Sequence, residues 1–432
     1  MRKLKIAVIG AGSTYTPELI NGFIKRRAEL EVASFYFMDI DREKMEIVAG
    51  LAERMLKASG IEANVVLTGD LDEAISNADY VIAQVRVGKL EARIRDERIP
   101  LKYDLLGQET TGAGGFMNAL RTVPVILDIA KKIKALAPEA WLINFSNPSG
   151  LIAEAILNSM EIKMIGLCNG PINMVRDVKA MLPEGAEAFD YDFVGLNHLC
   201  WITGIYADGK DIMDKLLQGE LDLKGLKNIP QTNYDASLLQ ATRGIPISYL
   251  NYYYFRDEQI KKCKNAEKTR GEICREIEAD LLKMYRNPDL HECPEELGKR
   301  GGALYSEAAV SIINSIENDK NEIHVVNIKN DGAYDFMDRD DVVEAKAVIN
   351  RKGPVPLALG SFKNQYIIGL MKAVKAYEKL AAEAALDGSY SAALGALMVH
   401  PLIGDYTKAK NVLDDMLEAN KEYLPQFFKG SR

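Results

Sequence analysis

A glycine turn near the start of the chain is the first group of residues suited to a specific chemistry. Gly10-Ala11-Gly12-Ser13 follows an apolar run, residues 3–9, and Thr16-Pro17-Glu18 comes soon after it. Glycines let the backbone touch a pyrophosphate, and the N-terminus of a following helix favours its negative charge. The run predicts a buried strand. Thr16 is expected to be the N-cap of a helix that has Pro17 at its first position.

An acidic residue completes this pattern. Residues 34–38 predict a second strand, which ends at Asp39, and a carboxylate at that point can accept hydrogen bonds from a ribose. Strand, glycine turn, helix, strand and acid in this order are typical of a nucleotide-binding βαβ unit. We therefore expect Gly10, Gly12, Ser13 and Asp39 to bind an NAD-type cofactor. A tight turn in an α/β core without a ligand is the alternative.

A cysteine and a histidine farther along the chain could bind a metal. Cys168 ends an expected strand and is followed by Asn169-Gly170-Pro171, and His198 ends the turn-like Gly195-Leu196-Asn197-His198. Both residue types bind divalent metals, which hold the thiol as a thiolate. On spacing alone, a buried free cysteine and a structural histidine remain the alternative.

Tyrosines follow in a cluster that includes Tyr249. A tyrosine can act as a base, but its ordinary pKa near 10 requires a cation or metal nearby. The same cluster, residues 249–254, could instead be the aromatic face of a helix.

Charged and amide side chains follow two other expected strands. Arg86 and Arg93 could clamp a phosphate, or they could belong to a solvated charged face. The glycine-rich, polar residues 107–115 are typical of a lid or binding loop. Asn144 and Asn147 could hydrogen-bond a cofactor or sugar, or cap the next helix.

These residues need an alternating α/β scaffold to position them, and the first half of the chain predicts one. Its expected strands, besides the first two, are residues 64–67, 80–84, 141–144 and 163–166. Its expected helices include residues 43–57, 120–136, 152–158 and 172–181. Such alternation favours a doubly wound, Rossmann-like parallel sheet.

The pattern changes after residue 192. An expected strand, residues 199–206, is followed by long helical stretches such as 267–285 and 362–385. We expect residues 1–195 to form an NAD-binding domain and residues 196–432 a largely helical α+β domain for substrate binding and oligomerisation, because 432 residues exceed one simple core.

Composition excludes several classes of partner. Apolar residues make up 47% and charged residues 27% of the chain, and its formal charge is -8. This balance predicts no nucleic-acid partner and no polybasic membrane anchor. The first apolar run is too short for a signal peptide, and no apolar stretch is long enough to span a bilayer. The 5 cysteines lack metal-finger spacing, which predicts a reducing cytoplasm.

Several short segments together resemble glycoside hydrolase family 4, the NAD- and metal-dependent glycosidases. Tyr15 stands where the usual dinucleotide pattern has a third glycine, and it is normal for this family. The matching segments run in family order over almost the whole chain. They are Gly10-Ala11-Gly12-Ser13 with Tyr15-Thr16-Pro17-Glu18-Leu19, Ile99-Pro100-Leu101-Lys102-Tyr103, Gly107-Gln108-Glu109-Thr110, Asn144-Phe145-Ser146-Asn147-Pro148, Cys168-Asn169-Gly170-Pro171, Gly195-Leu196-Asn197-His198, Ser248-Tyr249-Leu250, and Lys299-Arg300-Gly301-Gly302 with Tyr305-Ser306.

The resemblance implies a chemistry that differs from that of ordinary two-carboxylate glycosidases. NAD+ takes hydride from C3 of the sugar, a base removes the C2 proton, and the C1–O bond breaks by elimination. Water then adds, and NADH returns the hydride. A divalent metal, typically manganese, holds the C2 and C3 oxygens. Carried onto this chain, Cys168 and His198 are the metal ligands and Tyr249 is the base, while Glu109 and Asn147 join the cofactor-binding residues.

The resemblance also implies a substrate class. Members that act on α-linkages tend to carry Asp directly after the metal cysteine, and Asn169 in its place is similar to the β-acting subgroup. The expected activity is hydrolysis of 6-phospho-β-glucosides, including phosphorylated disaccharides. Expected substrate-binding residues are Arg86, Arg93, Asn147, Asn169 and Arg270. Arg270 resembles an arginine supplied by a neighbouring subunit, and the expected assembly is a homodimer or homotetramer.

Three alternatives remain from the sequence. Other members of the family act on 6-phospho-α-glucosides, galactosides or uronates. An NAD-dependent hydroxy-acid dehydrogenase would share the N-terminal architecture but would pair a catalytic histidine with an acid. A regulatory NAD-binding protein would show neither metal dependence nor turnover.

Overall fold

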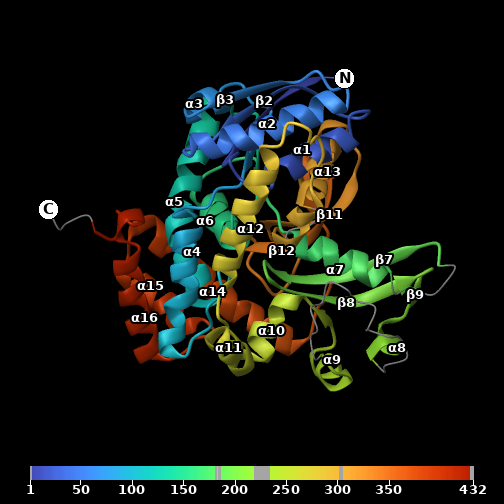
Figure 1. The fold of residues 1–432 in the computed structure, drawn as a ribbon. Helices are drawn as coiled ribbons and strands as arrows, with labels where there is room; N and C mark the ends of the chain where they lie inside the picture. The colour runs from blue at the N-terminus through green and yellow to red at the C-terminus, as the bar shows by residue number, and fades with distance from the viewer. Residues whose placement is uncertain (1, 181, 183–185, 218–233, 301–304, 429–432) are drawn as a thin grey trace.

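A computed structural model describes residues 2–180, 182, 186–217, 234–300 and 305–428 (Figure 1). Its described part contains a nine-stranded sheet with the order β13-β12-β11-β6-β5-β4-β1-β2-β3. These strands are β1 Lys3–Ile9, β2 Glu31–Met38, β3 Asn64–Thr68, β4 Tyr80–Ala83, β5 Trp141–Asn144, β6 Met164–Gly166, β11 Glu322–Lys329, β12 Val342–Asn350 and β13 Gly353–Pro356.

The first six strands form the doubly wound sheet that the sequence predicts. They are parallel and run in the order 3-2-1-4-5-6, which is typical of dinucleotide-binding domains. The strands β11, β12 and β13 extend the sheet beyond β6 by antiparallel pairing. The second half of the chain therefore completes the sheet of the first.

Helices cover both faces of the sheet (Figure 1). The helices of the described residues are α1 Thr16–Lys25, α2 Arg42–Ala58, α3 Leu71–Ile75, α4 Lys89–Arg98, α5 Gly112–Leu136, α6 Ser149–Ser159, α7 Asn169–Lys179, α8 Met213–Leu217, α9 Ala236–Thr242, α10 Asn251–Tyr254, α11 Arg256–Asn265, α12 Arg270–Tyr285, α13 Tyr305–Glu317, α14 Gln365–Asp387, α15 Tyr390–Val399 and α16 Tyr406–Ala419. Short 3₁₀ helices are η1 Pro100–Tyr103, η3 Ser248–Leu250, η4 Glu295–Arg300 and η5 Lys421–Tyr423.

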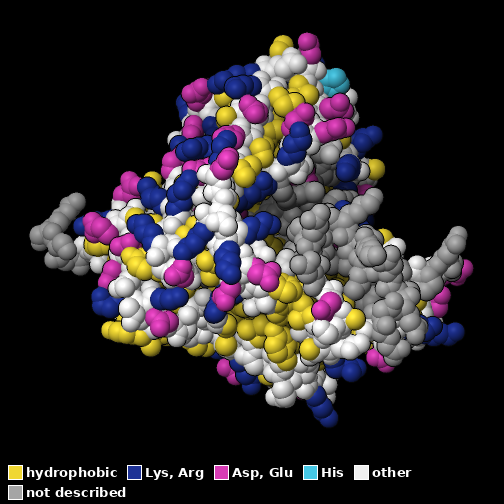
Figure 2. Space-filling view, turned by 60° about the horizontal axis from the view of Figure 1, so that its bottom comes forward, with side chains coloured by type: hydrophobic (Ala, Val, Ile, Leu, Met, Phe, Trp, Pro, Cys, Tyr) yellow, Lys and Arg dark blue, Asp and Glu magenta, His cyan; other side chains and the backbone are white. Residues whose placement is uncertain are grey.

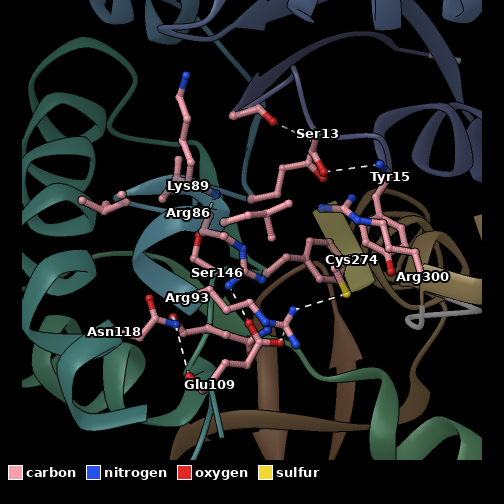
Figure 3. A pocket seen from close by; sticks show the side chains of 18 of the residues that line it. Ser13, Tyr15, Arg86, Lys89, Arg93, Glu109, Asn118, Ser146, Cys274 and Arg300 are labelled. Carbon is pink, nitrogen blue, oxygen red and sulfur yellow. Dashed lines mark hydrogen bonds and ion pairs between the residues drawn. The ribbon is translucent and has the colours of Figure 1, made fainter. Parts of the chain in front are cut away.

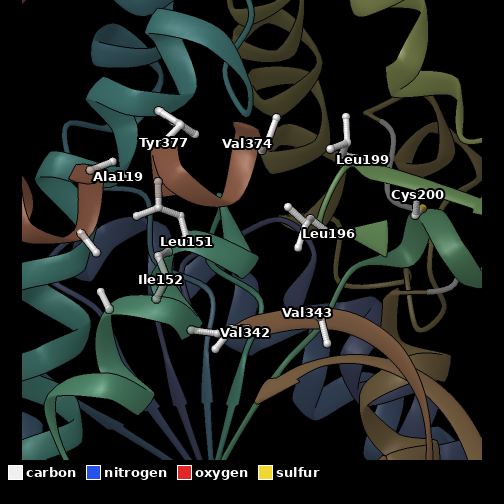
Figure 4. Packing of buried hydrophobic residues seen from close by; sticks show 14 of the residues in the cluster. Ala119, Leu151, Ile152, Leu196, Leu199, Cys200, Val342, Val343, Val374 and Tyr377 are labelled. Carbon is white, nitrogen blue, oxygen red and sulfur yellow. The ribbon is translucent and has the colours of Figure 1, made fainter. Parts of the chain in front are cut away.

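Two hydrophobic cores lie on opposite faces of the sheet because side chains alternate along each strand. In β1, Ile6 and Val8 pack with α1, α2 and α13, whereas Ala7 and Ile9 pack with α5 and α6. The core that contains Ala7 and Ile9 continues to a smaller sheet and to the C-terminal helices. Figure 4 shows part of it, with Leu196 of β7 and Val343 of β12 in the same cluster. The strands of the smaller sheet are β7 Phe189–Leu196, β8 Leu199–Ala207, β9 Lys210–Asp211 and β10 Ile245–Pro246.

Two local predictions were wrong. Thr16 is not the N-cap of α1, because the helix begins at Thr16 and its hydroxyl donates to the carbonyl of Ala11 at 2.8 Å. Residues 112–115 are not part of a loop, because α5 begins at Gly112. A Cβ on Gly114 would lie 2.1 Å from the carbonyl oxygen of Gln108. The glycines therefore let this helix start directly against residues 108–111.

The remaining boundaries differ less. The expected helix 172–181 is α7, which begins at Asn169, and position 181 lies outside the described residues, as do Gly301 and Gly302. In the described ranges, no helix is both long and apolar enough to cross a membrane. On the face drawn in Figure 2, Lys and Arg side chains lie interspersed with Asp and Glu.

Candidate active site

A cavity of about 1140 Å³ lies beyond the carboxyl ends of the parallel strands. Gly10, Asp39, Gln84 and Phe145 line it, and each comes directly after a strand. Doubly wound sheets bind ligands in this position. The cavity brings together these residues that the sequence predicts for the site: Gly10, Gly12, Ser13, Asp39, Arg86, Arg93, Glu109, Asn147, Asn169, Tyr249 and Arg270.

The glycine turn and the acid after β2 are joined directly. Gly10 has a φ of 85°, and a Cβ there would lie 2.8 Å from the carbonyl oxygen of Gln84. The Gly12 N–H donates to Oδ2 of Asp39 at 2.8 Å, and Oδ1 accepts from Asp41 N–H at 2.9 Å. A side chain at position 10 is therefore excluded, and the Asp39 carboxylate is held at the edge of the cavity.

Glu109 forms the centre of an ion-pair cluster on the cavity floor (Figure 3). Its carboxylate lies 2.5 Å from Arg86 and 2.9 Å from Arg93, and Arg93 also pairs with Glu97 at 2.8 Å. Burial opposes ionisation of Glu109, but Arg86 and Arg93 outweigh it and lower its pKa to about 2. Arg93 is buried, so it does not belong to a solvated face.

Cys168 and His198 are not among the residues that line the cavity, although Asn169, which follows Cys168, does line it. Cys168 is the N-cap of α7, and its sulfur accepts the N–H of Gly170 at 3.3 Å. The side chain of Asn197, which precedes His198, interacts with this sulfur and lowers the pKa of the thiol. The turns that carry Cys168 and His198 therefore meet at the Cys168 sulfur.

The electrostatics of this pair suit a cation. Burial raises the pKa of the Cys168 thiol and lowers the pKa of His198 to about 4. The imidazole is therefore neutral, which is the form that binds a metal. A bound divalent metal would favour the thiolate that burial disfavours. Among the described side chains, no group of three or more His, Cys, Asp or Glu residues could hold a metal.

Tyr249 lies against the predicted metal ligand. Its ring stacks on that of His198 with centroids 4.2 Å apart and planes 26° apart. Its ring also contacts that of Tyr252, with centroids 6.2 Å apart. The cluster forms η3 and α10, so the alternative of one helix with an aromatic face is not what the structure has. Tyr249 and Tyr252 line the cavity, while Tyr253 donates to or accepts from Thr111 behind it.

The two asparagines after β5 have different surroundings. Asn144 is buried, and its side chain bonds the backbone of Ser146 in both directions, at 3.1 and 3.2 Å. Asn147 lines the cavity, and its carbonyl accepts from the side chain of Asn118 at 3.0 Å. Neither asparagine caps α6, whose N-cap is Pro148.

Helix α12 contributes Cys274 and Glu278 to the cavity, and sequence reasoning missed both residues. Cys274 accepts from Arg93 at 3.7 Å, and Arg300 pairs with Glu278 at 2.9 Å (Figure 3). Arg270 donates to the carbonyls of Lys299 and Arg300 at 2.9 and 3.0 Å, and it lines the cavity of its own chain. No local pattern marks Cys274 or Glu278, because long-range packing alone brings this part of α12 to the cavity. The contribution of Arg270 to a neighbouring subunit stays a prediction.

Comparison with known families matches nearly the whole chain. Residues 5–184 match the model "Family 4 glycosyl hydrolase", and residues 193–403 match "Family 4 glycosyl hydrolase C-terminal domain". A Bacillus subtilis protein named "Probable 6-phospho-beta-glucosidase" is 43% identical over 98% of this chain and 98% of its own length.

Solved structures give the same result for the fold. The 6-phospho-beta glucosidase from Thermotoga maritima, solved with manganese, NAD+ and glucose-6-phosphate, superposes with a TM-score of 0.88 and 36% identity, and the match covers 97% of this chain and 99% of that one. Malate dehydrogenase from Plasmodium falciparum, solved with NADH, has a TM-score of 0.53 and 14% identity over 89% of this chain and 99% of that one, which indicates a shared fold alone.

Proposed function

Because this chain belongs to the family 4 glycosyl hydrolases, we propose that it hydrolyses 6-phospho-β-glucosides with the aid of NAD+ and a divalent metal ion, typically Mn2+. The observation that carries the proposal is the contact of Tyr249 with His198. It places a potential base against a potential metal ligand, at the edge of the cavity that begins at the glycine turn. The names of the relatives at 36–43% identity support the substrate class.

The residues present fit a dinucleotide. The Gly10 turn leaves no room for a side chain, so backbone N–H groups can approach a pyrophosphate, and α1 begins directly after it. Asp39 lies where a ribose is recognised in this fold. Ser13, Glu109 and Asn147 complete the proposed cofactor site.

The residues also fit a metal ion, with Cys168 and His198 as its protein ligands. When bound, the two cofactors supply a reversible hydride acceptor for C3 and a positive charge beside the C2 and C3 oxygens. Tyr249 removes the C2 proton, and its closeness to His198 would place its hydroxyl near that charge, which favours the phenolate. Since two protein ligands leave positions open, the sugar oxygens can take them.

Asn169 and the arginines account for the proposed specificity. Asn169 follows Cys168 directly and lines the cavity, but its amide cannot give a proton to a leaving group as a carboxylic acid can. This favours β-linked substrates. Arg86, Arg93, Asn147 and Arg270 are the proposed phosphate-binding residues. Arg86 and Arg93 already share Glu109, which holds both guanidinium groups in place.

The remaining features of the proposal concern the whole chain. We place the NAD-binding domain at residues 1–195 and the substrate and oligomerisation domain at residues 196–432. The enzyme is proposed to be a cytoplasmic homodimer or homotetramer.

One set of assays tests the proposal. The purified enzyme, stripped of nucleotide and metal, is given p-nitrophenyl 6-phospho-β-glucoside, its α-anomer or the unphosphorylated β-glucoside, with and without NAD+ and Mn2+. We expect turnover of the first substrate only when both cofactors are present, without net NADH. Loss of the phosphate should lower kcat/KM by about 10²–10⁴.

Each failure has a distinct meaning. Activity without NAD+ would reject the mechanism, and net NADH would favour a dehydrogenase. Equal cleavage of the α-anomer would reject the role of Asn169. In that case Asn169→Asp, which introduces a carboxylic acid at this position, should leave the relative cleavage of the two anomers unchanged. Comparable kcat/KM on the unphosphorylated glucoside would reject the phosphate-binding residues.

A further inference from the structure

The side chain of Asn197 is held by two hydrogen bonds close to Cys168. Its Oδ1 accepts the N–H of Gly150 at 3.0 Å, and because an N–H can donate only to oxygen, this contact fixes the orientation of the amide. The NH₂ group must then face the other way. It donates to Oε1 of Glu344 at 3.2 Å, and the same side chain lowers the pKa of the Cys168 thiol, with which it interacts.

Glu344 reaches this point from β12, in the second half of the chain. It is fully buried, and its Oε1 also accepts from Asn327 of β11 at 3.1 Å. Its Oε2 has no hydrogen-bond partner among the described atoms. A buried carboxyl group is costly to desolvate, so an apolar side chain would be more stable if packing were its only role.

Helix α6 also packs closely against the side chain of Asn197. A Cβ on Gly150 would lie 2.6 Å from Cβ of Asn197, so α6 holds this side chain closely. Leu196, which precedes Asn197 at the end of β7, is buried in the core that also contains Val343 of β12 (Figure 4). The Asn197 amide is therefore fixed both by contact and by its hydrogen bonds.

We propose that Glu344 and Asn197 are positioning residues that orient the Cys168 sulfur for metal binding, with Glu344 acting through Asn197. The proposal rests on the proposed role of Cys168 and His198 as metal ligands. Groups that hydrogen-bond metal ligands fix ligand geometry, and their loss costs about 10–100-fold in metal affinity. Glu344 holds one N–H of Asn197, which directs the other toward the sulfur.

Four variants of the full chain test this, with Mn2+ affinity measured by titration in the presence of NAD+. Glu344→Leu removes the acceptor and should weaken Mn2+ binding about 10–100-fold, and Asn197→Ala should do the same. Glu344→Gln keeps an acceptor oxygen for Asn197 and should remain within about threefold of wild type. Asn327→Leu is the matched control. It removes an equally buried hydrogen bond to Glu344 that does not lead to Cys168, so Mn2+ affinity should remain close to wild type while stability falls.

A second readout does not depend on turnover. In the Co2+-substituted protein, the sulfur-to-cobalt charge-transfer absorption should weaken or shift in Glu344→Leu and Asn197→Ala but not in Asn327→Leu. Wild-type Mn2+ affinity and an unchanged cobalt spectrum in folded Asn197→Ala would overturn the proposal, even if Glu344→Leu does not fold. Cys168→Ala tests whether Cys168 is a metal ligand at all. If it binds Mn2+ as the wild type does, the metal site itself is wrong.

Discussion

The phenol of Tyr249 can be tested alone because its ring contact with His198 does not depend on the hydroxyl. We expect Tyr249→Phe to keep NAD+ and substrate binding and to lose about 10²–10⁴ in kcat. Exchange of the substrate C2 hydrogen with solvent deuterium, followed by NMR, should stop with it. Tyr253→Phe is the matched control, because that hydroxyl contacts Thr111 behind the cavity. Undiminished exchange in Tyr249→Phe would mean that another group is the base.

The charge of Glu109 makes stability depend on pH. Its pKa in the folded state is about 2, below the value of about 4.3 expected when unfolded. The ionised group therefore stabilises the fold fully above pH ~4.3, and this contribution is lost as the pH falls toward 2. We expect Glu109→Gln to lower Tm most at neutral pH, by an amount that shrinks as the pH falls to about 3. The exposed Glu161→Gln should change Tm little at any pH, and a constant deficit in Glu109→Gln would contradict the assigned pKa.

Residue identities predicted much of the site before any geometry was known. Gly10, Asp39 and Tyr249 were each found from type and neighbours, and all of them line one cavity. The roles given to these side chains stay predictions. Asn197 directly precedes His198, which was predicted as a metal ligand. The proposed role of Asn197 could not be predicted, because its partner Glu344 is far along the chain and carries no local pattern.

At the scale of elements, the start of α5 gives a sharp prediction. A Cβ on Gly114 would lie 2.1 Å from the carbonyl oxygen of Gln108, so Gly114→Ala should displace residues 108–111, which include Glu109. We expect a loss of about 2 kcal/mol or more in the free energy of unfolding, together with most of the activity. Gly369→Ala in the exposed part of α14, where nothing lies within 4 Å, should instead be neutral or stabilising. Similar unfolding midpoints for the two variants would contradict this packing.

The same glycines explain why this element was mispredicted. In sequence, residues 107–115 have the composition of a loop, since glycine is a poor helix former. Close packing against Gln108 and Thr110 outweighs that propensity, because only glycine fits between the loop and the helix. The parallel strands were predicted well for the opposite reason. Three of them, β4, β5 and β6, are short apolar runs that are buried on both faces.

At the scale of the whole molecule, the shared sheet predicts that the first 195 residues are not independent. The strand β11 pairs with β6, and α13 packs against α1 in the core on one face. A fragment of residues 1–195 would expose these surfaces. We expect circular dichroism to show no cooperative thermal transition for the fragment at the Tm of the full chain. A fragment that melts cooperatively and binds NAD+ would show that the N-terminal domain folds alone.

The late position of β11 also has a consequence during synthesis. The edge of β6 is complete at residue 166, but its partner strand begins only at residue 322. At about 5–20 residues per second, the ribosome needs roughly 8–30 s to make the intervening chain. For that time the nascent protein carries an uncovered strand edge, to which another chain can pair. The order of strands in this sheet therefore makes translation speed and chaperone access part of how the enzyme reaches its folded state.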